Sequence, residues 1–176
     1  MTGEKPKAFS RVTDMFHVIQ VFSMKIKGLL QPEDIIPDLS AETKDDALCE
    51  LAAKVSERHP GVDRGEILRI LLERERLGST GIGDGIAIPH GKLKRLDQPV
   101  MVFARSLSGV DFDALDGRPV NIFFLIIAPE AAVGVHLKIL ARVSRILKDP
   151  AVRKRLIEAP DATSIYAAIQ EQDSRY

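Results

Sequence analysis

A glycine-rich stretch at residues 77–92 constrains the fold more than any other feature of this sequence. It places four glycines within eight residues, at positions 78, 81, 83 and 85. Because glycine loses more backbone entropy on ordering than other residues, this density of glycine excludes a regular helix. The apolar run 86–88 that follows predicts a short buried strand. Pro89 then interrupts it, since proline fixes φ and has no backbone N–H to donate.

His90 comes directly after this interruption, so the sequence places it at a strand end, beside Gly91, which has no Cβ to cover it. A neutral imidazole is a good nucleophile near pH 7 because its ordinary pKa is about 6.5. Phosphoryl transfer mainly requires alignment and hydrogen-bond donors around the phosphoryl oxygens. The glycine-rich backbone before His90, Gly91 after it and the nearby Lys92 are candidate donors. An isolated Pro-His-Gly would more simply be an ordinary polar turn, and the long glycine run is what favours a reactive histidine.

Two segments, GSTGIG at residues 78–83 and IAIPHG at 86–91, together resemble the phosphorylation-site signature of enzyme IIA of the bacterial phosphotransferase system. The similarity is to the mannitol/fructose-type fold group, and more closely to its nitrogen-related regulatory branch. It extends from about Leu29 to about Gln170. In that family the histidine of the Ile-Pro-His-Gly motif accepts a phosphoryl group from a small histidine-phosphorylated carrier protein. The resemblance therefore implies that His90 is the phosphoacceptor nucleophile.

Arg74 is a candidate for stabilising the phosphoryl group. The predicted helix over residues 63–77 ends in the charged turn 73–76, which leads directly into the glycine-rich stretch. An arginine in this turn can reach a group bound by the loop, whereas charge pairing on a solvated helix face is the alternative. The resemblance favours Arg74, because a matching arginine lies near the phosphohistidine in the nitrogen-related branch.

His136 is a candidate partner of His90. The predicted helix over residues 133–148 carries His136 on the same stripe as Leu140, Val143 and Leu147, so His136 faces inward at its first turn. A histidine on such a stripe is usually a satisfied core residue. Here it follows the most apolar run of the chain, and ligands collect at strand carboxyl ends in open α/β sheets. The family places a histidine followed by leucine at the start of this helix, so the resemblance implies that His136 hydrogen-bonds His90 or stabilises the phosphoryl group.

The remaining pattern predicts helices before and after a group of strands. Residues 120–128 form the most apolar run and predict a central strand buried on both faces. Other expected segments are a strand at 100–104, an edge strand between prolines at 31–39, and polar loops at 92–98 and 111–119. Helices are expected at 43–58, 63–77, 133–148, 150–159 and 161–170. This order predicts a three-layer α/β sandwich, with a mixed β-sheet flanked by helices on both sides, and leaves the strand order open.

The expected domain organisation is a poorly ordered N-terminal extension at residues 1–23, followed by an enzyme IIA-like phosphoacceptor domain at residues 24–176. An ordered helix at residues 13–24 is the alternative for the extension. Cys49 lies inside an apolar helical pattern and is expected to be a small buried side chain.

Charge and hydropathy exclude several classes of partner. Formal charges balance at 25 against 25, so no general attraction to nucleic acid or to an anionic membrane is expected. No apolar run approaches the roughly 18 residues of a membrane span, and no secretory signal is recognised. The sequence therefore predicts a cytoplasmic protein with no nucleic acid partner and no direct membrane insertion.

The leading interpretation is a phosphoacceptor that receives a phosphoryl group on His90 from a carrier protein resembling HPr, with no cofactor. Within the family, two roles are open. A regulatory IIA would use its phosphorylation state to control downstream regulatory proteins, whereas a sugar-transport IIA would pass the group to a IIB component. Residues 78–92 resemble the regulatory branch more closely. We therefore expect a regulator, with phosphate transfer to a IIB component as the alternative.

A metal-dependent hydrolase built on His90 and His136 is the alternative from another class of protein. Zinc would need a third protein ligand, and no His, Cys or Glu near either histidine stands at ligand spacing. No metal is therefore expected. A simple binding module, in which His90 and the glycine-rich stretch have no chemical role, is the third interpretation.

Overall fold

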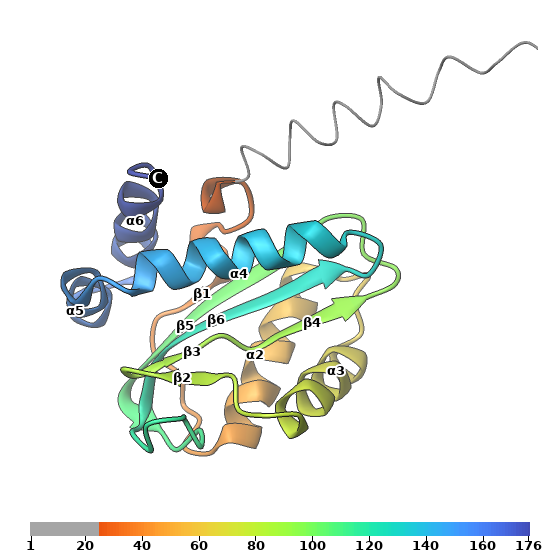
Figure 1. Ribbon diagram of the computed structural model, residues 1–176, viewed down its shortest axis with the longest axis horizontal. Coiled ribbons are helices and arrows are strands. Elements are labelled where there is room, and N and C mark those ends of the chain that lie inside the picture. The colour runs from red at the N-terminus through yellow and green to blue at the C-terminus, as the bar shows by residue number, and fades with distance from the viewer. Residues whose placement is uncertain (1–24) are drawn as a thin grey trace, which may run out of the picture.

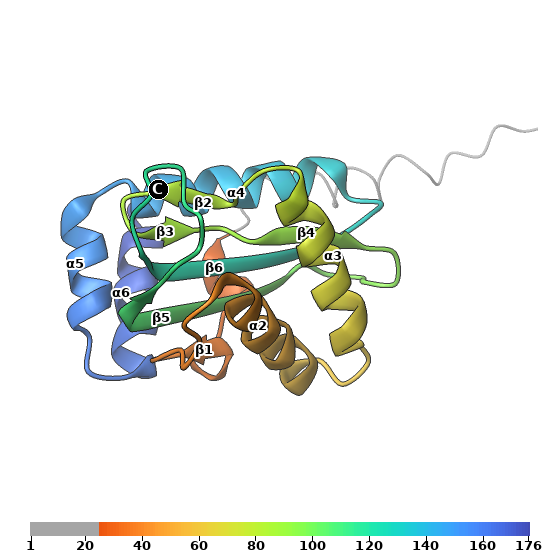
Figure 2. The same ribbon diagram turned by 90° about the horizontal axis from the view of Figure 1, so that it is seen from below.

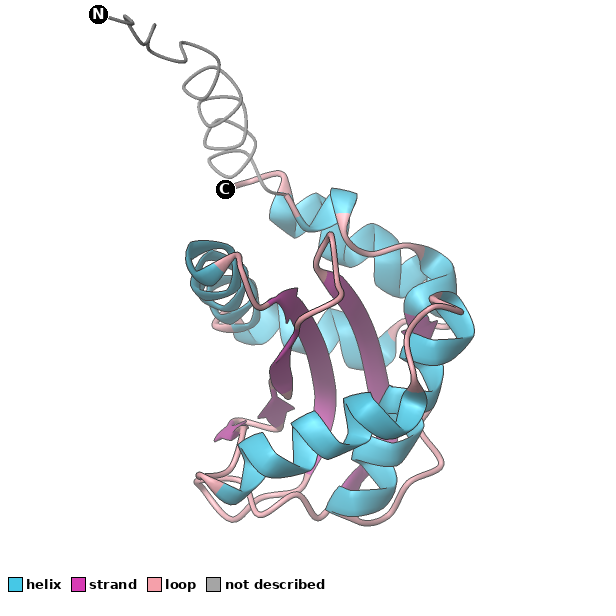
Figure 3. Cartoon of the chain, turned by 90° about the vertical axis from the view of Figure 1, so that its right-hand side faces the viewer, coloured by secondary structure: helices cyan, strands magenta, loops and turns pink. Residues whose placement is uncertain are grey.

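The computed structural model describes residues 25–176. In this part of the chain, a six-stranded mixed sheet lies between two layers of helices (Figure 1 and Figure 3). The predicted three-layer α/β sandwich, with helices on both sides of the sheet, is confirmed. The expected extension at residues 1–23 and its alternative, a helix at 13–24, lie outside the described residues.

Strand β6 (Val120–Pro129) is the centre of the sheet, as its apolar sequence predicts. The strand order is β1-β5-β6-β3-β2, and β4 also pairs with β6. β5 (Val100–Val110) is antiparallel to β6 and extends beyond the expected strand at 100–104. β3 (Ile86–Ala87) and β4 (His90–Leu93) are both parallel to β6. Two strands that follow each other in the sequence therefore share one neighbour.

The glycine-rich stretch forms a hairpin rather than an irregular loop. β2 (Gly81–Gly83) pairs antiparallel with β3 at one edge of the sheet. The two residues between these strands, Asp84 and Gly85, have φ of 54° and 74°, the positive values that tight hairpin turns require. At the opposite edge, β1 (Ile35–Ile36) pairs in parallel with β5. The edge strand expected at 31–39 is shorter than predicted, because a 3-10 turn, η2 (Pro32–Asp34), occupies its first part.

β4 corrects two expectations about the region of His90. The ten-residue β6 extends past the end of β3, so residues 90–93 find free hydrogen-bonding groups there, with His90 opposite Ile126 and Leu93 opposite Pro129. Gly91 and Leu93 are buried and Lys92 is exposed, which is the alternation of a strand. Residues 92 and 93 are therefore not part of a polar loop, and His90 begins a strand instead of ending one.

The helices begin and end close to their predicted positions because polar side chains cap them. Three caps are Thr43 for α2 (Lys44–Arg58), Asp63 for α3 (Arg64–Arg76) and Asp161 for α6 (Ala162–Asp173), each accepting a backbone N–H three residues on. The other helices are α4 (Val133–Leu147) and α5 (Pro150–Glu158), and a 3-10 turn, η1 (Ile26–Gly28), precedes η2. Cys49 is half-buried rather than buried, and Arg64 Nη2 lies 2.8 Å from its sulfur.

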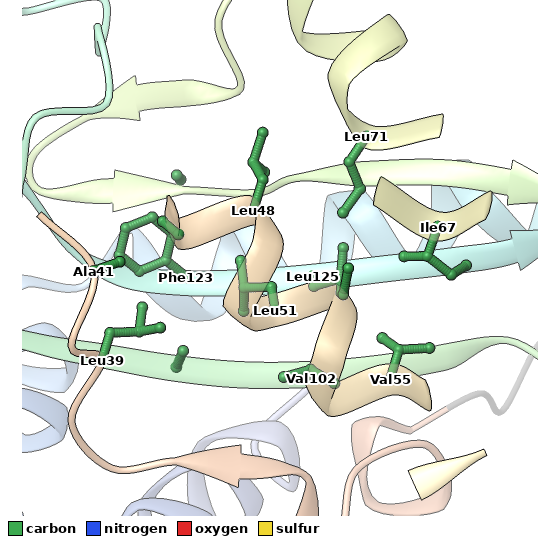
Figure 4. Packing of buried hydrophobic residues seen from close by; sticks show 14 of the residues in the cluster. Leu39, Ala41, Leu48, Leu51, Val55, Ile67, Leu71, Val102, Phe123 and Leu125 are labelled. Atoms are coloured by element: carbon green, nitrogen blue, oxygen red, sulfur yellow. The ribbon is translucent and has the colours of Figure 1, made fainter. Parts of the chain in front are cut away.

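The core consists of two clusters, one on each face of the sheet. α2 and α3 cover one face and α4 covers the other, as Figure 2 shows from the side of α2 and α3. Successive residues of β6 alternate between the clusters, so Phe123 and Leu125 face α2, whereas Phe124 and Ile126 face α4. Figure 4 shows the first cluster, in which Leu48 and Leu51 of α2 meet Phe123 and Leu125. Packing on both faces of the sheet holds β6 in place, and pairing with β6 sets the register of β4.

Candidate functional site

The two ring nitrogens of His90 have different partners. Nδ1 lies 2.8 Å from the carbonyl oxygen of Ile88, and Nε2 lies 3.1 Å from Nε of Arg74. A carbonyl oxygen can only accept a hydrogen bond and a guanidinium can only donate one. Nδ1 therefore carries the proton, and Nε2 has a lone pair that faces Arg74. This is a neutral imidazole with its nucleophilic nitrogen directed away from the sheet backbone.

Arg74 comes from the last turn of α3, and the glycine-rich stretch holds it in place. Its Nη1 donates to the carbonyl oxygen of Gly78 at 3.0 Å, while Nε contacts His90. Gly78 has a φ of 144°, a conformation that residues with a side chain rarely adopt. The sequence predicts that an arginine in this turn reaches the site, and the structure places Arg74 there.

His136 lies in the first turn of α4 and is buried, with 7% of its surface exposed. Its ring centroid is 5.1 Å from that of His90, and the two ring planes are inclined at 55°. Nδ1 of His136 has no hydrogen-bond partner among the described residues. His136 therefore faces inward and lies beside His90, as predicted, and the alternative of a satisfied core histidine does not fit its unpartnered Nδ1. A buried ring nitrogen without a partner can bind a group carried by His90.

Burial and neighbouring charges keep both histidines neutral at pH 7. Burial lowers the pKa of His90 below its ordinary value, and the charge of Arg74 lowers it further. The hydrogen bond to Ile88 and the charge of Glu75 act in the opposite direction on that pKa. Burial also lowers the pKa of His136, to about 4, with smaller contributions from His90, Lys92 and Arg74. Neutral rings are the form in which His90 has a free lone pair.

These side chains meet in an open pocket of about 410 Å³. Its lining residues are Ile70, Glu73, Arg74, Leu77, His90, Gly91, Lys92 and His136. Two cationic side chains of the lining, Arg74 and Lys92, outnumber its one carboxylate, Glu73, so positive charge is in excess. Leu77, also in the lining, is 85% exposed. A half-buried nucleophile with two cations beside it, open to a second protein, can take up an anionic group such as phosphoryl.

The glycines before His90 have a different role from the one expected. Residues 78, 81, 83 and 85 are not among the residues that line the pocket, and the backbone N–H groups of Gly78 and Gly81 already donate, to the carbonyl oxygen of Glu75 and the hydroxyl of Ser79. Gly78 instead orients Arg74 through its carbonyl oxygen, and the other three form the β2–β3 hairpin. Gly91 and Lys92, the other predicted donors, do line the pocket.

Sequence reasoning missed the close packing between Gly91 and α3. A Cβ built on Gly91 would lie 2.3 Å from Cγ2 of Ile70, which is far too close. The absence of a side chain at residue 91 lets α3 approach β4 and brings Arg74 within reach of His90. Gly91 itself is the signal in the sequence, where it indicates an uncovered His90 and a candidate backbone donor but not the contact with α3.

Residues 25–176 contain neither a cluster of metal ligands nor a helix that could span a membrane. This part of the chain contains no group of three or more His, Cys, Asp or Glu residues that could hold a metal ion. None of its helices is long and apolar enough to cross a membrane.

The chain matches a protein family described as "Phosphoenolpyruvate-dependent sugar phosphotransferase system, EIIA 2" over residues 28–172. It is 44% identical over 146 residues to a nitrogen regulatory protein of Bradyrhizobium diazoefficiens, which covers 83% of this chain and 95% of that protein. It is 37% identical over 150 residues to a fructose-specific EIIABC component of Bacillus subtilis, covering 85% of this chain but 24% of that protein. The solved structure of nitrogen regulatory protein IIA-Ntr from Neisseria meningitidis is similar, with a TM-score of 0.77 and 31% identity, over 82% of this chain and 98% of that one.

Proposed function

The chain belongs to the phosphoenolpyruvate-dependent sugar phosphotransferase system EIIA 2 family, and on this basis we propose that it accepts a phosphoryl group on His90 from a histidine-phosphorylated, HPr-like carrier protein. The observation that carries the proposal is the lone pair of Nε2, which faces Arg74 in an open pocket beside His136. The similarity extends over 28–172, close to the expected range from Leu29 to Gln170, so it includes all three side chains.

Transfer begins with attack of Nε2 on the phosphorus of the carrier's phosphohistidine. A bond forms between Nε2 and phosphorus, and the bond between phosphorus and the carrier nitrogen breaks, leaving its electron pair on the carrier imidazole. The ring of His90 gains positive charge, and the Nδ1–H bond to Ile88 stabilises that charge because the carbonyl dipole points at it. No proton has to leave His90 before the attack, since Nε2 is unprotonated at the start.

Arg74 and His136 stabilise the transferred group. Arg74 contacts Nε2 in the free protein, so its guanidinium turns to the phosphoryl oxygens when phosphorus occupies that position. The buried ring of His136 stands 5.1 Å from that of His90, and a phosphoryl oxygen gives its ring nitrogen the partner that it lacks among residues 25–176. Lys92, at the pocket edge, adds a second positive charge.

Regulation is the role that we propose for the phosphorylated form, with downstream regulatory proteins as its partners. The support is the match to a nitrogen regulatory protein over 95% of that protein's length. The fructose-specific relative is matched over 24% of its length, and it favours the alternative of a IIA that passes phosphate to a IIB component. Transfer of the phosphoryl group from this protein to a fructose- or mannitol-type IIB at a rate matching that of a sugar IIA would favour transport instead.

The test is intact mass after incubation with phosphoenolpyruvate, the first enzyme of the phosphotransferase system and its carrier. We expect the mass of one phosphoryl group, labile to acid, on the wild-type protein and none on His90→Ala. His59→Gln is the matched control, because His59 lies at the end of α2, outside the pocket, and this variant should gain the group normally. A folded wild-type protein that gains no mass, with an active carrier, would contradict the proposal.

The metal-dependent hydrolase makes a different prediction. His90 and His136 would then bind zinc, for which residues 25–176 offer no third His, Cys, Asp or Glu in a suitable group. We expect metal analysis of the purified protein to find no stoichiometric zinc. Zinc at one equivalent per chain, lost in His136→Gln, would favour the hydrolase.

A further inference from the structure

Glu75 is a buried carboxylate directly behind the site. It follows Arg74 in α3 and has 8% of its surface exposed. A carboxylate in the last turn of a helix opposes the helix dipole, and burial of an ion is costly unless partners compensate it. Such a residue in a surface turn of four charged residues is unexpected.

The partners of Glu75 are the residues that precede β2. Its two oxygens accept the backbone N–H of Thr80 at 3.1 and 3.0 Å, and the hydroxyl of Thr80 donates to Oε2 at 2.6 Å. Nζ of Lys44, the first residue of α2, lies 3.3 Å from Oε1 and supplies the opposite charge. Lys44 also contacts Asp113, in the turn between β5 and β6, at 3.0 Å. Two donors of Thr80, its backbone N–H shared between both oxygens and its hydroxyl, are thus bound to one carboxyl group.

A hydrogen-bonded path continues from Thr80 to His90. The carbonyl oxygen of Thr80 accepts the backbone N–H of Ile88 at 3.0 Å. The carbonyl oxygen of Ile88 then accepts the Nδ1–H of His90 at 2.8 Å. Arg74 contacts the other nitrogen of the same ring. Adjacent residues of α3 therefore act on opposite sides of one imidazole, Arg74 directly and Glu75 through Thr80 and Ile88.

We propose that Glu75 is a positioning residue which, through Thr80 and Ile88, holds His90 in the tautomer that presents an unprotonated Nε2. This inference rests on the proposed function, because it explains how the phosphoacceptor nitrogen is selected. An imidazole can rotate and can carry its proton on either nitrogen, and a fixed carbonyl acceptor at Nδ1 removes that choice. The negative charge of Glu75 also raises the pKa of His90, opposing Arg74.

The experiment compares Glu75→Gln with Glu57→Gln. Glu57 is the matched control, because it is also the penultimate residue of its helix and also contacts a lysine, Lys54 at 3.2 Å, but on the exposed surface. In Glu75→Gln the side-chain amide has one acceptor oxygen in place of two, so Thr80 loses part of its support. Thr80→Val replaces the hydroxyl with a methyl group of similar volume, and Thr80→Ser keeps the hydroxyl, so the two variants together test the same path.

Two readouts separate positioning from simple folding. Long-range ¹H–¹⁵N spectra of the unphosphorylated protein report which nitrogen of His90 carries the proton, and the initial rate of phosphoryl uptake from the carrier reports reactivity. We expect wild type, Glu57→Gln and Thr80→Ser to show an unprotonated Nε2. Glu75→Gln and Thr80→Val should show mixed tautomers and uptake slower by about tenfold to a hundredfold, the usual cost of misplacing a reacting group. Thermal unfolding confirms that each variant is folded.

A failure of this inference and a failure of the proposed function give different results in these measurements. Wild-type tautomer and rate in both folded variants, Glu75→Gln and Thr80→Val, would overturn the role of Glu75 and leave His90 as the acceptor. If wild type takes up no phosphoryl group, the proposed function fails, and the tautomer spectra of the unphosphorylated protein still decide whether Glu75 orients the ring. Loss of rate in Thr80→Val without any change of tautomer would also contradict the path described here.

Discussion

At the scale of single residues, the contact between Arg74 and His90 combines two effects on one nitrogen. The guanidinium lowers the pKa of His90 and so keeps the ring neutral, and it also stands where the phosphoryl oxygens would arrive. The first effect is measurable without any phosphoryl donor. The second appears only in the transfer reaction.

Replacing Arg74 by Gln should therefore raise the pKa of His90, since one of the two causes that lower it is removed. Phosphoryl uptake should fall by about a hundredfold, the typical cost of losing one charged donor at a reacting group. NMR titration of the ring and the pH dependence of uptake check this together. Uptake needs the neutral ring, so it is lost as pH falls through the pKa of His90, and this loss should begin at a higher pH in the variant.

Arg76→Gln is the control for that experiment, because Arg76 is exposed in the same helical turn and does not line the pocket. It should leave both the pKa of His90 and the rate unchanged. An unchanged pKa of His90 in Arg74→Gln would show that the guanidinium lies farther from the ring in solution than the 3.1 Å seen here.

The sequence was sufficient to select His90, Arg74 and His136, and the structure brings all three into one pocket. It was not sufficient to select Glu75 or to assign the two nitrogens of His90. Those depend on Lys44, 31 positions before Glu75, and on the path through Thr80 and Ile88. A pattern along the chain identifies reactive residue types, whereas burial of a charge depends on partners that are brought together only by folding.

At the scale of secondary structure elements, the close packing of α3 on β4 controls the site. Gly91→Ala introduces a methyl group 2.3 Å from Ile70, so α3 must move away from the sheet. We expect the free energy of unfolding to fall by about 1–3 kcal/mol, the usual cost of overpacking. Phosphoryl uptake should also fall, because Arg74 moves with α3. Urea unfolding and the uptake assay measure the two effects.

The double variant Gly91→Ala, Ile70→Ala is the control for overpacking, since the shorter side chain at residue 70 leaves room for the added methyl group. It should recover much of the uptake, although loss of the isoleucine itself lowers stability. Uptake equal to wild type in Gly91→Ala alone would mean that the position of α3 does not determine reactivity.

The elements that sequence reasoning found are those with a repeated pattern. All five described α-helices and the strands β5 and β6 show helical or apolar patterns of sufficient length, and capping residues mark four helix starts. The sequence does not indicate β2 and β4, because a strand of three or four residues is too short to show an alternation of apolar and polar side chains. They are strands only because a neighbour offers free hydrogen-bonding groups, β3 for β2 and the long β6 for β4.

At the scale of the whole molecule, stability should depend on pH through His136. Folding lowers its pKa from 6.5 to about 4, so the native state binds fewer protons than the unfolded chain between these values. The contribution of His136 to the free energy of unfolding is therefore fully present above pH 6.5 and is lost as pH falls toward 4. Each pKa unit is worth about 1.4 kcal/mol, and screening by solvent reduces this contribution to about 1–2 kcal/mol.

Urea unfolding at a series of pH values, on wild type and His136→Asn, measures this contribution. The difference in unfolding free energy between the two proteins should narrow from pH 7 to pH 4, because only wild type has this group to protonate. Acidic residues whose pKa values are lowered, such as Asp116 and Asp161, contribute equally to both proteins and cancel. A difference that is independent of pH would contradict the lowered pKa of His136.

The layered architecture of the molecule followed from the order of its elements, but the strand order did not. The pairing of β1 with β5 and of β3 and β4 with β6 joins segments far apart in sequence, and several arrangements satisfy the same local patterns. The apolar character of β6 placed it at the centre, and its burial on both faces confirms that position. The length of β6 allows β4 to form, but the sequence alone does not indicate this, because β4 pairs with β6 only in the folded chain.

The anchoring of His90 on β6 has a consequence for how a partner could recognise the phosphorylated protein. The backbone on both sides of His90 is bonded to a strand that is packed on both faces, so a phosphoryl group there meets a stiff support. It would bring nearly two negative charges to a chain whose formal charges cancel, 25 against 25. The two forms would then share one outline and differ in local potential, turning a cationic patch into a neutral or anionic one. A partner that distinguishes the two forms would therefore detect the change in electrostatic potential rather than a change in shape. Its preference for one form should weaken as added salt screens the field.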